Sequence, residues 1–363
     1  MKKNKNYVDL KDQPVPEGQH LLEVDDLKMY FHTEDGIVRA VDGVSYTLDR
    51  GETLGVVGES GSGKSVTAMT IMGLISMPPG KIEGGDVRYR GRSILEMTEE
   101  EMQHIRGNDI AMIFQDPMTS LNPVYKIGKQ VGEGLRLHRG YSKQEALKHA
   151  TELLDLVGIP EPEKRVNEYP HQFSGGMRQR VMIAMALACD PDILIADEPT
   201  TALDVTIQAQ IIELMQEMQE KNGNAIIMIT HDLGVVADMA DKIMVMYAGR
   251  PVEFGTAEEI FYESRHPYTW GLIRSIPEQA IDEKKPLTPI HGNPPSLMNL
   301  PEGCVFSPRC PYATDKCRKQ RPERVVTESG HYSACHYSGD PEFLKNAPET
   351  SRTRKDSKKG GEA

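Results

Sequence analysis

The sequence predicts an α/β protein with a mixed, mostly parallel sheet at its core, an antiparallel β subdomain, an α-helical subdomain and an irregular C-terminal extension. Three observations predict this fold. Apolar runs of strand length alternate with helical patterns between residues 52 and 115 and again between 190 and 240, as in parallel sheets. Residues from about 120 to 185 are helical in pattern. Beyond residue 275 the sequence becomes Pro-rich and irregular.

Length and charge set the first limits. A chain of 363 residues is long enough for one large core plus an extension. Its net charge of −12 disfavours long nucleic acids as partners, because phosphate binding needs a basic surface. No stretch reaches the ~18 apolar residues of a membrane span. The polar N-terminus has no apolar signal region, so we expect a cytosolic, reducing environment.

The N-terminal part is predicted to be a disordered lead followed by a hairpin. Residues 1–19 are polar and contain proline, which is typical of a segment that cannot bury a core. The β-rich runs "HLLEVDDLKMYF" and "IVRAVDGVSYTL" then flank a turn at Asp35-Gly36. They are expected to open a domain that spans residues 20–270.

The remaining elements follow from apolar patterns and their stop signals. The runs "ETLGVVG", "DIAMIFQ", "DILIAD" and "NAIIMIT" do not alternate, as in strands buried on both faces. A helix over "SKQEALKHATELLDLVG" is predicted by the capping-box pair Ser142 and Glu145 and by its stop at Gly158. "VTIQAQIIELMQEMQEKNG" is a second helix, which ends at Gly223. "KIMVMYAGRPVEFG" is a predicted hairpin.

A phosphate-binding loop is predicted at "GESGSGKS", Gly58–Ser65, between a buried strand and a helix. Its backbone N–H groups and the helix N-terminus can face phosphate oxygens. Lys64 can reach the β- and γ-phosphates of ATP, and the Ser65 hydroxyl can bind Mg²⁺. The predicted nucleotide-binding positions of the loop are Ser60, Gly61, Ser62, Gly63, Lys64, Ser65 and Val66.

A second motif narrows the chemistry. "ILIADEPT" is an apolar strand that ends in Asp197 and Glu198, and the ends of parallel strands open onto the ligand crevice. Asp197 is expected to hold Mg²⁺ through water, and Glu198 to polarise the attacking water as general base. A P-loop alone leaves kinases, GTPases and many ATPases open, and this second motif narrows the choice.

A third motif gives the family resemblance. With the other two, "FSGGMRQR" (Phe173–Arg180) resembles the signature of ATP-binding-cassette (ABC) ATPases over roughly residues 20–270. The resemblance implies that Ser174, Gly175 and Gly176 face the nucleotide of a second cassette. A helix N-terminus after these residues suits that contact. Met177 stands where a Gln is usual, but the backbone donors survive that difference.

The same resemblance assigns further positions. Gln115 in "IFQDP" is similar to the glutamine that senses Mg²⁺ and water, and His231 in "ITHD" to the histidine that contacts the γ-phosphate. Asp204 in "TALD" resembles the D-loop aspartate. Phe31 is the aromatic predicted to stack on adenine, with Tyr30 as the alternative.

A finer resemblance extends over nearly the whole chain. "QDPMTSLNPV", "YPHQFSGGMRQR", "HPYTWGLIRSIP" and the cysteine segment resemble the ATPase subunits of oligopeptide and dipeptide permeases. This implies a peripheral subunit at the cytoplasmic face of the membrane that drives peptide import. Its implied partners are a related second ATPase subunit, two transmembrane permease subunits and an extracytoplasmic peptide-binding protein. "HPYTWGL" has no physical explanation from sequence.

Two other functions fit the sequence less well. A soluble cassette that acts on nucleic acid or ribosomes usually has two cassettes, a coiled-coil insertion or basic surfaces, whereas this chain has one cassette and an excess of acid. A P-loop small-molecule kinase does not account for "FSGGMRQR". We therefore expect an importer ATPase that does not bind nucleic acid.

The predicted extension, residues 271–340, contains Cys304, Cys310, Cys317 and Cys335. Zinc sites usually show closely spaced cysteine pairs, and none is present. The irregular spacing favours an iron–sulfur cluster, and the resemblance implies a 4Fe–4S cluster. Zinc and unligated thiols remain alternatives, as do His331 and His336 as substitute ligands. We expect the ATP site to be independent of this segment, and residues 341–363 to be a disordered tail.

Overall fold

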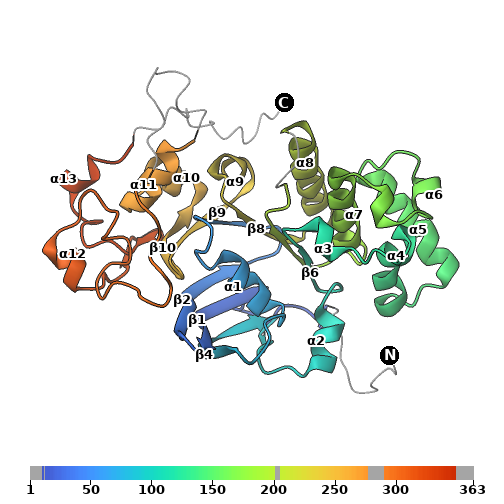
Figure 1. Ribbon diagram of the computed structural model, residues 1–363, viewed down its shortest axis with the longest axis horizontal. Helices are drawn as coiled ribbons and strands as arrows, with labels where there is room; N and C mark the ends of the chain where they lie inside the picture. The colour runs from blue at the N-terminus through green and yellow to red at the C-terminus, as the bar shows by residue number, and fades with distance from the viewer. Residues whose placement is uncertain (1–9, 12, 201–204, 277–289, 349–363) are drawn as a thin grey trace.

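The computed structural model describes residues 10, 11, 13–200, 205–276 and 290–348. Two sheets organise this part of the chain (Figure 1). The larger sheet contains, in spatial order, β11 (Val325–Val326), β12 (Tyr332–Ser333), β10 (Arg250–Thr256), β9 (Lys242–Tyr247), β3 (Thr53–Val57), β8 (Ala225–Thr230), β7 (Ile193–Asp197) and β6 (Ile110–Ile113). The smaller, antiparallel sheet contains β2 (Gly36–Leu48), β1 (Leu22–Thr33), β4 (Gly80–Tyr89) and β5 (Arg92–Ser93).

The central strands are buried on both faces, as their unbroken apolar runs predict. The five strands from β9 to β6 pair in parallel, and β10 turns back antiparallel to β9, which confirms the predicted hairpin. Successive residues of β8 point to opposite cores. Ile226 and Met228 belong to one hydrophobic cluster, and Ile227 and Ile229 to the other. The predicted mixed, mostly parallel sheet is confirmed.

Each face of the large sheet carries its own cover. The antiparallel sheet, α1 (Lys64–Ile71) and α2 (Glu99–Ile105) enclose one core. The helices on the other core include α7 (Gly175–Leu187), α8 (Val205–Asn222), α9 (Leu233–Met239), α10 (Ala257–Tyr262) and α11 (Pro267–Arg274). In Figure 1 the antiparallel sheet lies below the central sheet and these helices lie above it or beside it.

The predicted helical subdomain forms one end of the molecule (Figure 1). It contains α3 (Pro117–Ser120), α4 (Ile127–His138), α5 (Lys143–Leu156) and α6 (Pro162–Arg165), which gather around α7. The predicted start of α5 is confirmed, because Ser142 and Glu145 form both hydrogen bonds of a capping box. Gly158 follows with φ of 72°, a conformation that favours glycine.

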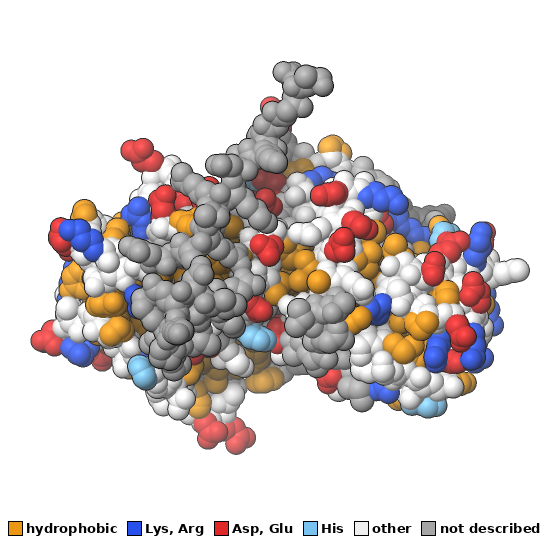
Figure 2. Space-filling view, turned by 90° about the horizontal axis from the view of Figure 1, so that it is seen from above, with side chains coloured by type: hydrophobic (Ala, Val, Ile, Leu, Met, Phe, Trp, Pro, Cys, Tyr) orange, Lys and Arg blue, Asp and Glu red, His pale blue; other side chains and the backbone are white. Residues whose placement is uncertain are grey.

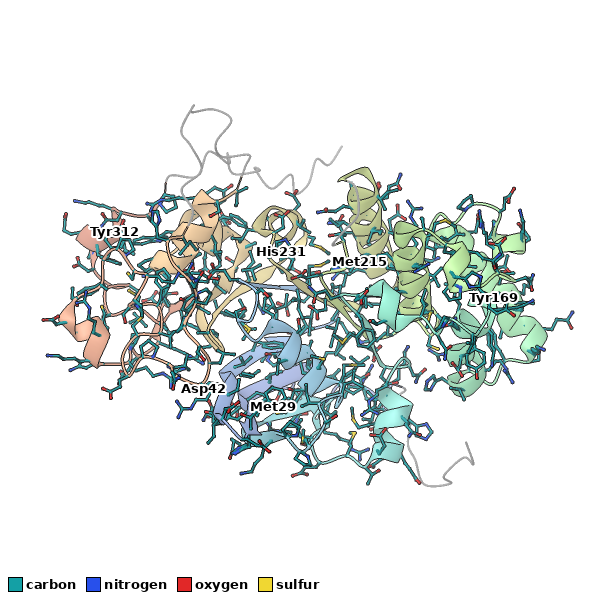
Figure 3. All side chains as sticks on the ribbon, viewed as in Figure 1. Met29, Asp42, Tyr169, Met215, His231 and Tyr312 are labelled. Atoms are coloured by element: carbon teal, nitrogen blue, oxygen red, sulfur yellow. The ribbon has the colours of Figure 1, made fainter. Side chains whose placement is uncertain are left out.

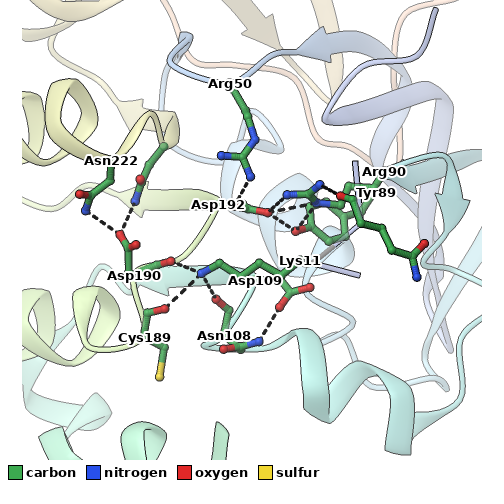
Figure 4. A network of polar contacts seen from close by, with 12 residues as sticks. Lys11, Arg50, Tyr89, Arg90, Asn108, Asp109, Cys189, Asp190, Asp192 and Asn222 are labelled. Carbon is green, nitrogen blue, oxygen red and sulfur yellow. Dashed lines mark hydrogen bonds and ion pairs between the residues drawn. The ribbon is translucent and has the colours of Figure 1, made fainter. Parts of the chain in front are cut away.

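Part of the expected disordered lead is packed. Leu10 is 1% exposed, and the Lys11 ammonium donates hydrogen bonds to the carbonyls of Asn108 and Cys189 (Figure 4). Arg90 donates to the Gln13 carbonyl. The expectation is therefore wrong for these described residues. The polar composition of residues 1–19 gave no indication that Leu10 is buried.

A buried polar network lies next to Lys11 (Figure 4). The carboxylate of Asp192 accepts hydrogen bonds from Arg90 Nη2 at 2.5 Å, from the Tyr89 hydroxyl at 2.6 Å and from Arg50 Nη2 at 2.7 Å. These residues come from the antiparallel sheet, the loop before β3 and the loop before β7. These hydrogen bonds to one buried carboxylate help to fix the two sheets relative to each other.

The C-terminal extension joins the main fold instead of forming a separate unit. β12 pairs with β10, Glu253 lying opposite Ser333, so the extension lengthens the large sheet. Val305 and Phe306 belong to the same core as the central strands. The extension also contains α12 (Asp315–Lys319).

Residues 341–348 also differ from the expected disordered tail. They contain α13 (Pro341–Leu344), and the Phe343 ring lies 5.2 Å from that of Trp270 and 5.5 Å from that of Tyr312, centroid to centroid. Residues 349–363 are outside the described part. Among the described residues, the longest apolar helices are still too short or too polar to cross a bilayer.

Candidate active site

The phosphate-binding loop lies between β3 and α1, as predicted. Gly58 and Gly63 have φ of 153° and 100°. A Cβ at Gly58 would stand 2.2 Å from the Met246 carbonyl oxygen, and one at Gly63 would stand 2.3 Å from that of Ala40. Only glycine fits these two positions. Ser60 and Gly61 are exposed at the tip of the loop, Ser62 is buried, and Val66 packs against the core. The loop is thus held against the sheet with its tip open to a ligand.

Lys64 is buried inside this loop. Its side chain donates hydrogen bonds to the carbonyl oxygens of Gly58 at 2.7 Å and Glu59 at 3.0 Å. Burial lowers the pKa of the Lys64 ammonium, and the nearby carboxylates of Glu198, Asp197 and Glu59 oppose that shift. The loop therefore holds one cation close to the position where phosphate oxygens are expected to bind.

Ser65 and Asp197 meet at the end of β7. The Ser65 hydroxyl donates to Asp197 Oδ1 at 3.0 Å, and Asp197 is 4% exposed. Burial raises the pKa of the Asp197 carboxyl, and Glu198 raises it further. A bound cation would favour the charged form of both acids. This oxygen set fits Mg²⁺, which prefers hydroxyl, carboxylate and phosphate ligands.

The three predicted catalytic side chains lie together. Gln115 Nε2 donates to Glu198 Oε2 at 2.9 Å, and His231 Nδ1 lies 3.4 Å from Glu198 Oε1. Glu198 has φ of 47°, a rare conformation for a non-glycine residue, and its N–H donates to the Ile229 carbonyl. His231 is 63% exposed and lies near the middle of the molecule (Figure 3). A general base, a water-orienting amide and a phosphate-contacting histidine would need this proximity.

The signature residues lie elsewhere. Ser174 caps α7, accepting a hydrogen bond from the Met177 N–H at 3.3 Å, so the cap survives with Met177 in place of the usual Gln. Ser174 and Gly175 are exposed, and a Cβ at Gly175 would meet nothing within 4 Å. Gly176 lies in the first turn of α7. Figure 1 shows α7 among the helical subdomain, apart from α1. This open helix N-terminus is free to face another molecule.

Two further predictions concern adenine and the D-loop. Phe31 is partly buried on the core face of β1, and the neighbouring Tyr30 donates its hydroxyl to Asp42 Oδ1 at 3.0 Å. Tyr30 is therefore engaged by the other face of the strand, and Phe31 stays the predicted adenine contact. Asp204 lies outside the described residues.

Sequence reasoning missed a residue next to the loop, although its motif was noticed. Tyr268 of "HPYTWGL" is buried, and its hydroxyl accepts a hydrogen bond from the Glu59 N–H at 2.8 Å. The rest of the motif builds α11. His266 Nδ1 accepts from the Tyr268 N–H, and Trp270 Nε1 donates to the Ser264 carbonyl. The motif thus anchors a helix behind the phosphate-binding loop.

The cysteines lie around one small cavity of about 20 Å³, which all four line together with His336 and Tyr312. Tyr312 marks this end of the molecule in Figure 3. Burial, reinforced by the neighbouring thiols, raises the pKa of Cys310 to about 11 and that of Cys335 to about 12. Burial also raises the pKa of Cys304. Without a cation, these thiols are expected to be neutral at pH ~7.

The cysteine cavity has some features of a metal site and lacks others. Backbone N–H groups of Phe306, Tyr312 and Tyr337 donate to the sulfurs of Cys304, Cys310 and Cys335, respectively. Such bonds stabilise thiolates. However, no three His, Cys, Asp or Glu side chains in the described part are placed as metal ligands. His331 is also engaged elsewhere, its Nε2 lying 3.0 Å from Glu253 Oε1.

Comparison with known proteins bears on both regions. A model of the ABC transporter family matches residues 41–201, and a model of the oligopeptide/dipeptide transporter C-terminal region matches residues 252–317. The chain is 58% identical to the oligopeptide transport ATP-binding protein OppD of Bacillus subtilis, over 86% of this chain and 87% of that one. The chain belongs to the ATP-binding proteins of ABC transporters. It is also 52% identical to the dipeptide transport ATP-binding protein DppD of Escherichia coli, over 88% of this chain and 97% of that one.

Solved structures agree on the cassette. One neighbour is an ATP-binding cassette described as a dimer in a post-hydrolysis state with ADP and Pi. It matches with a TM-score of 0.60 and 29% identity, covering 65% of this chain and 98% of that one. The fold is therefore that of an ATP-binding cassette. ATP and Mg²⁺ are consistent with the phosphate-binding site described above.

Proposed function

We propose that this chain is the ATP-hydrolysing subunit of an importer for oligopeptides or dipeptides. The observation that carries the proposal is the meeting of Gln115, Glu198 and His231 beside the P-loop, in a chain whose relatives are named oligopeptide and dipeptide transport proteins. Glu198 activates water, while Lys64, Ser65 and Asp197 hold MgATP. Phe31 stacks on adenine.

The partners follow from the open signature end. Ser174–Gly176 and Asp204 act on the nucleotide of a second cassette, a related subunit, so that ATP closes the pair. Two transmembrane permease subunits and an extracytoplasmic peptide-binding protein complete the assembly, and this chain sits at the cytoplasmic face of the membrane. Closure of the pair is then transmitted to the membrane subunits.

For the cysteine cavity we propose a 4Fe–4S cluster held by Cys304, Cys310, Cys317 and Cys335. Four buried or partly buried thiols line one cavity, and three of them accept hydrogen bonds from backbone N–H groups. Both features support the proposal, because a cluster deprotonates its ligands and gains from such bonds. Anaerobically purified protein is expected to be brown and to contain about four iron atoms per chain. Stoichiometric zinc without iron would replace the cluster by a zinc site, and four free thiols without metal would reject ligation.

Purification of the intact complex through a tag on this chain tests the transporter role. We expect one related ATPase subunit and two membrane subunits, identified by mass, and ATPase activity that a peptide-loaded binding protein stimulates. The rival function, action on ribosomes or nucleic acid, predicts co-sedimentation with ribosomes instead. On the face that Figure 2 shows, outside the grey atoms, Lys and Arg side chains occur in small groups among acidic ones.

A further inference from the structure

Arg309, the residue before Cys310, is bound to the phosphate-binding loop. Its guanidinium forms a two-point ion pair with Glu59, Nη1 to Oε2 at 2.6 Å and Nη2 to Oε1 at 3.0 Å. The Arg309 side chain is 4% exposed and that of Glu59 is 30% exposed. The remaining donors are used as well, on the carbonyls of Ile290 and His291. A buried two-point ion pair of this kind fixes the positions of both side chains and also neutralises the Glu59 charge.

Glu59 is the second residue of the loop and is held at both its ends. Its backbone N–H donates to the Tyr268 hydroxyl, and its carboxylate is held by Arg309. Its carbonyl accepts from Lys64, and its carboxylate is close enough to shift the pKa of the Lys64 ammonium upward. An unpaired Glu59 would therefore place a negative charge beside the cation that binds phosphate.

The turn that carries Arg309 also carries two of the cysteines. The N–H groups of Arg309 and Cys310 both donate to the Phe306 carbonyl at 3.0 Å. The Phe306 ring is buried in the main core, against Tyr247 and Tyr268. One tight turn thus places a ring in the core, thiols in the cysteine cavity and a guanidinium on the P-loop.

We infer that Arg309 is a positioning residue of the nucleotide site, through which the cysteine-containing segment braces the P-loop and neutralises Glu59. The phosphates of the nucleotide carry negative charge into a loop that already holds one carboxylate. With Arg309 in place, Glu59 is paired, and Lys64 is left to the phosphates. The Arg309–Glu59 ion pair joins the extension to the P-loop, so this inference departs from the expectation that the ATP site is independent of that segment.

Calorimetric titration of the full-length chain with MgADP tests this inference. Arg309→Met is expected to weaken MgADP binding by about tenfold or more, because it leaves a partly buried carboxylate unpaired beside Lys64. Adding Glu59→Gln to this variant removes that charge and should restore the affinity to within about threefold of the parent. Arg309→Lys keeps a charge without the fork and should fall between the two.

Arg318→Met is the matched control, since Arg318 lies in the same segment, is 59% exposed and pairs with the exposed Asp315. It should bind MgADP like the parent. Unchanged affinity in Arg309→Met would overturn the inference. So would a double variant as weak as Arg309→Met, because Arg309 would then act only through folding. If Arg309→Met does not yield folded protein, Arg309→Lys with and without Glu59→Gln gives the same comparison, and equal affinities would again reject the inference.

Discussion

The ATP site is assembled from the ends of neighbouring strands, whereas the cysteine cavity is assembled from turns. Asp197 and Glu198 end β7, His231 follows β8, and Gln115 follows β6. The cavity instead takes its cysteines from loops and from the short helix α12. Strands buried on both faces fix the first site through their core packing. The second has little secondary structure of its own to fix it, so its contacts with the cassette, and the cluster proposed above, must do so.

The largest expected effect lies in the strand-built site. Glu198→Gln keeps the shape and the hydrogen bond with Gln115 but removes the base. We expect MgATP to bind nearly as before and hydrolysis in the assembled transporter to slow by roughly a hundredfold or more. Single-turnover hydrolysis and nucleotide titration measure the two separately. Asp238→Asn, a carboxylate of α9, serves as a charge-matched control. Near-normal turnover of the Glu198 variant would move the base elsewhere.

The same contrast explains which parts of the fold and of the ATP site can be predicted from the sequence. The P-loop glycines, Asp197 and the apolar strands are local patterns, and each predicts its own structure. Their meeting could be predicted because parallel strands end at one edge. The pairing of Arg309 with Glu59 joins residues 250 positions apart, and no local pattern marks it. The burial of Leu10 is also not marked by any local pattern, because a single apolar residue among polar neighbours does not predict packing.

An intermediate effect is expected from Cys310→Ser. On the cluster proposal, loss of one thiol should abolish iron binding and increase hydrogen exchange in residues 300–340, because ligation free energy is folding free energy in such a segment. Since Arg309 is the preceding residue, MgADP affinity should also fall, by about two- to fivefold. This loss should be smaller than for Arg309→Met, since the guanidinium is still present.

Cys189→Ser is the control for Cys310→Ser, because Cys189 is a buried thiol of the cassette outside the cavity. It should leave metal content unchanged. A Cys310 variant that loses metal but keeps both normal exchange and normal MgADP affinity would separate the two sites again. It would also show that the turn around Phe306 holds its shape without the cysteines.

The smallest effect at neutral pH is expected at His266, which joins the two regions behind the P-loop. His266 is 1% exposed, and burial lowers its pKa to about 3. Between that value and the ordinary value near ~6.5, the unfolded chain binds a proton here that the folded chain does not. The contribution of this residue should therefore leave stability unaffected above pH ~7 and lower it by about 1.4 kcal/mol for each pH unit below pH ~6.

His266→Asn keeps a side-chain acceptor for the Tyr268 N–H but cannot titrate. Urea unfolding at pH ~7.5, ~6.5 and ~5.5 should show a shallower loss of stability for the variant, whatever its stability at pH ~7.5. Parallel curves for the two proteins would mean that His266 is protonated in the folded chain, and the packing of α11 against the P-loop would then have to tolerate a buried charge.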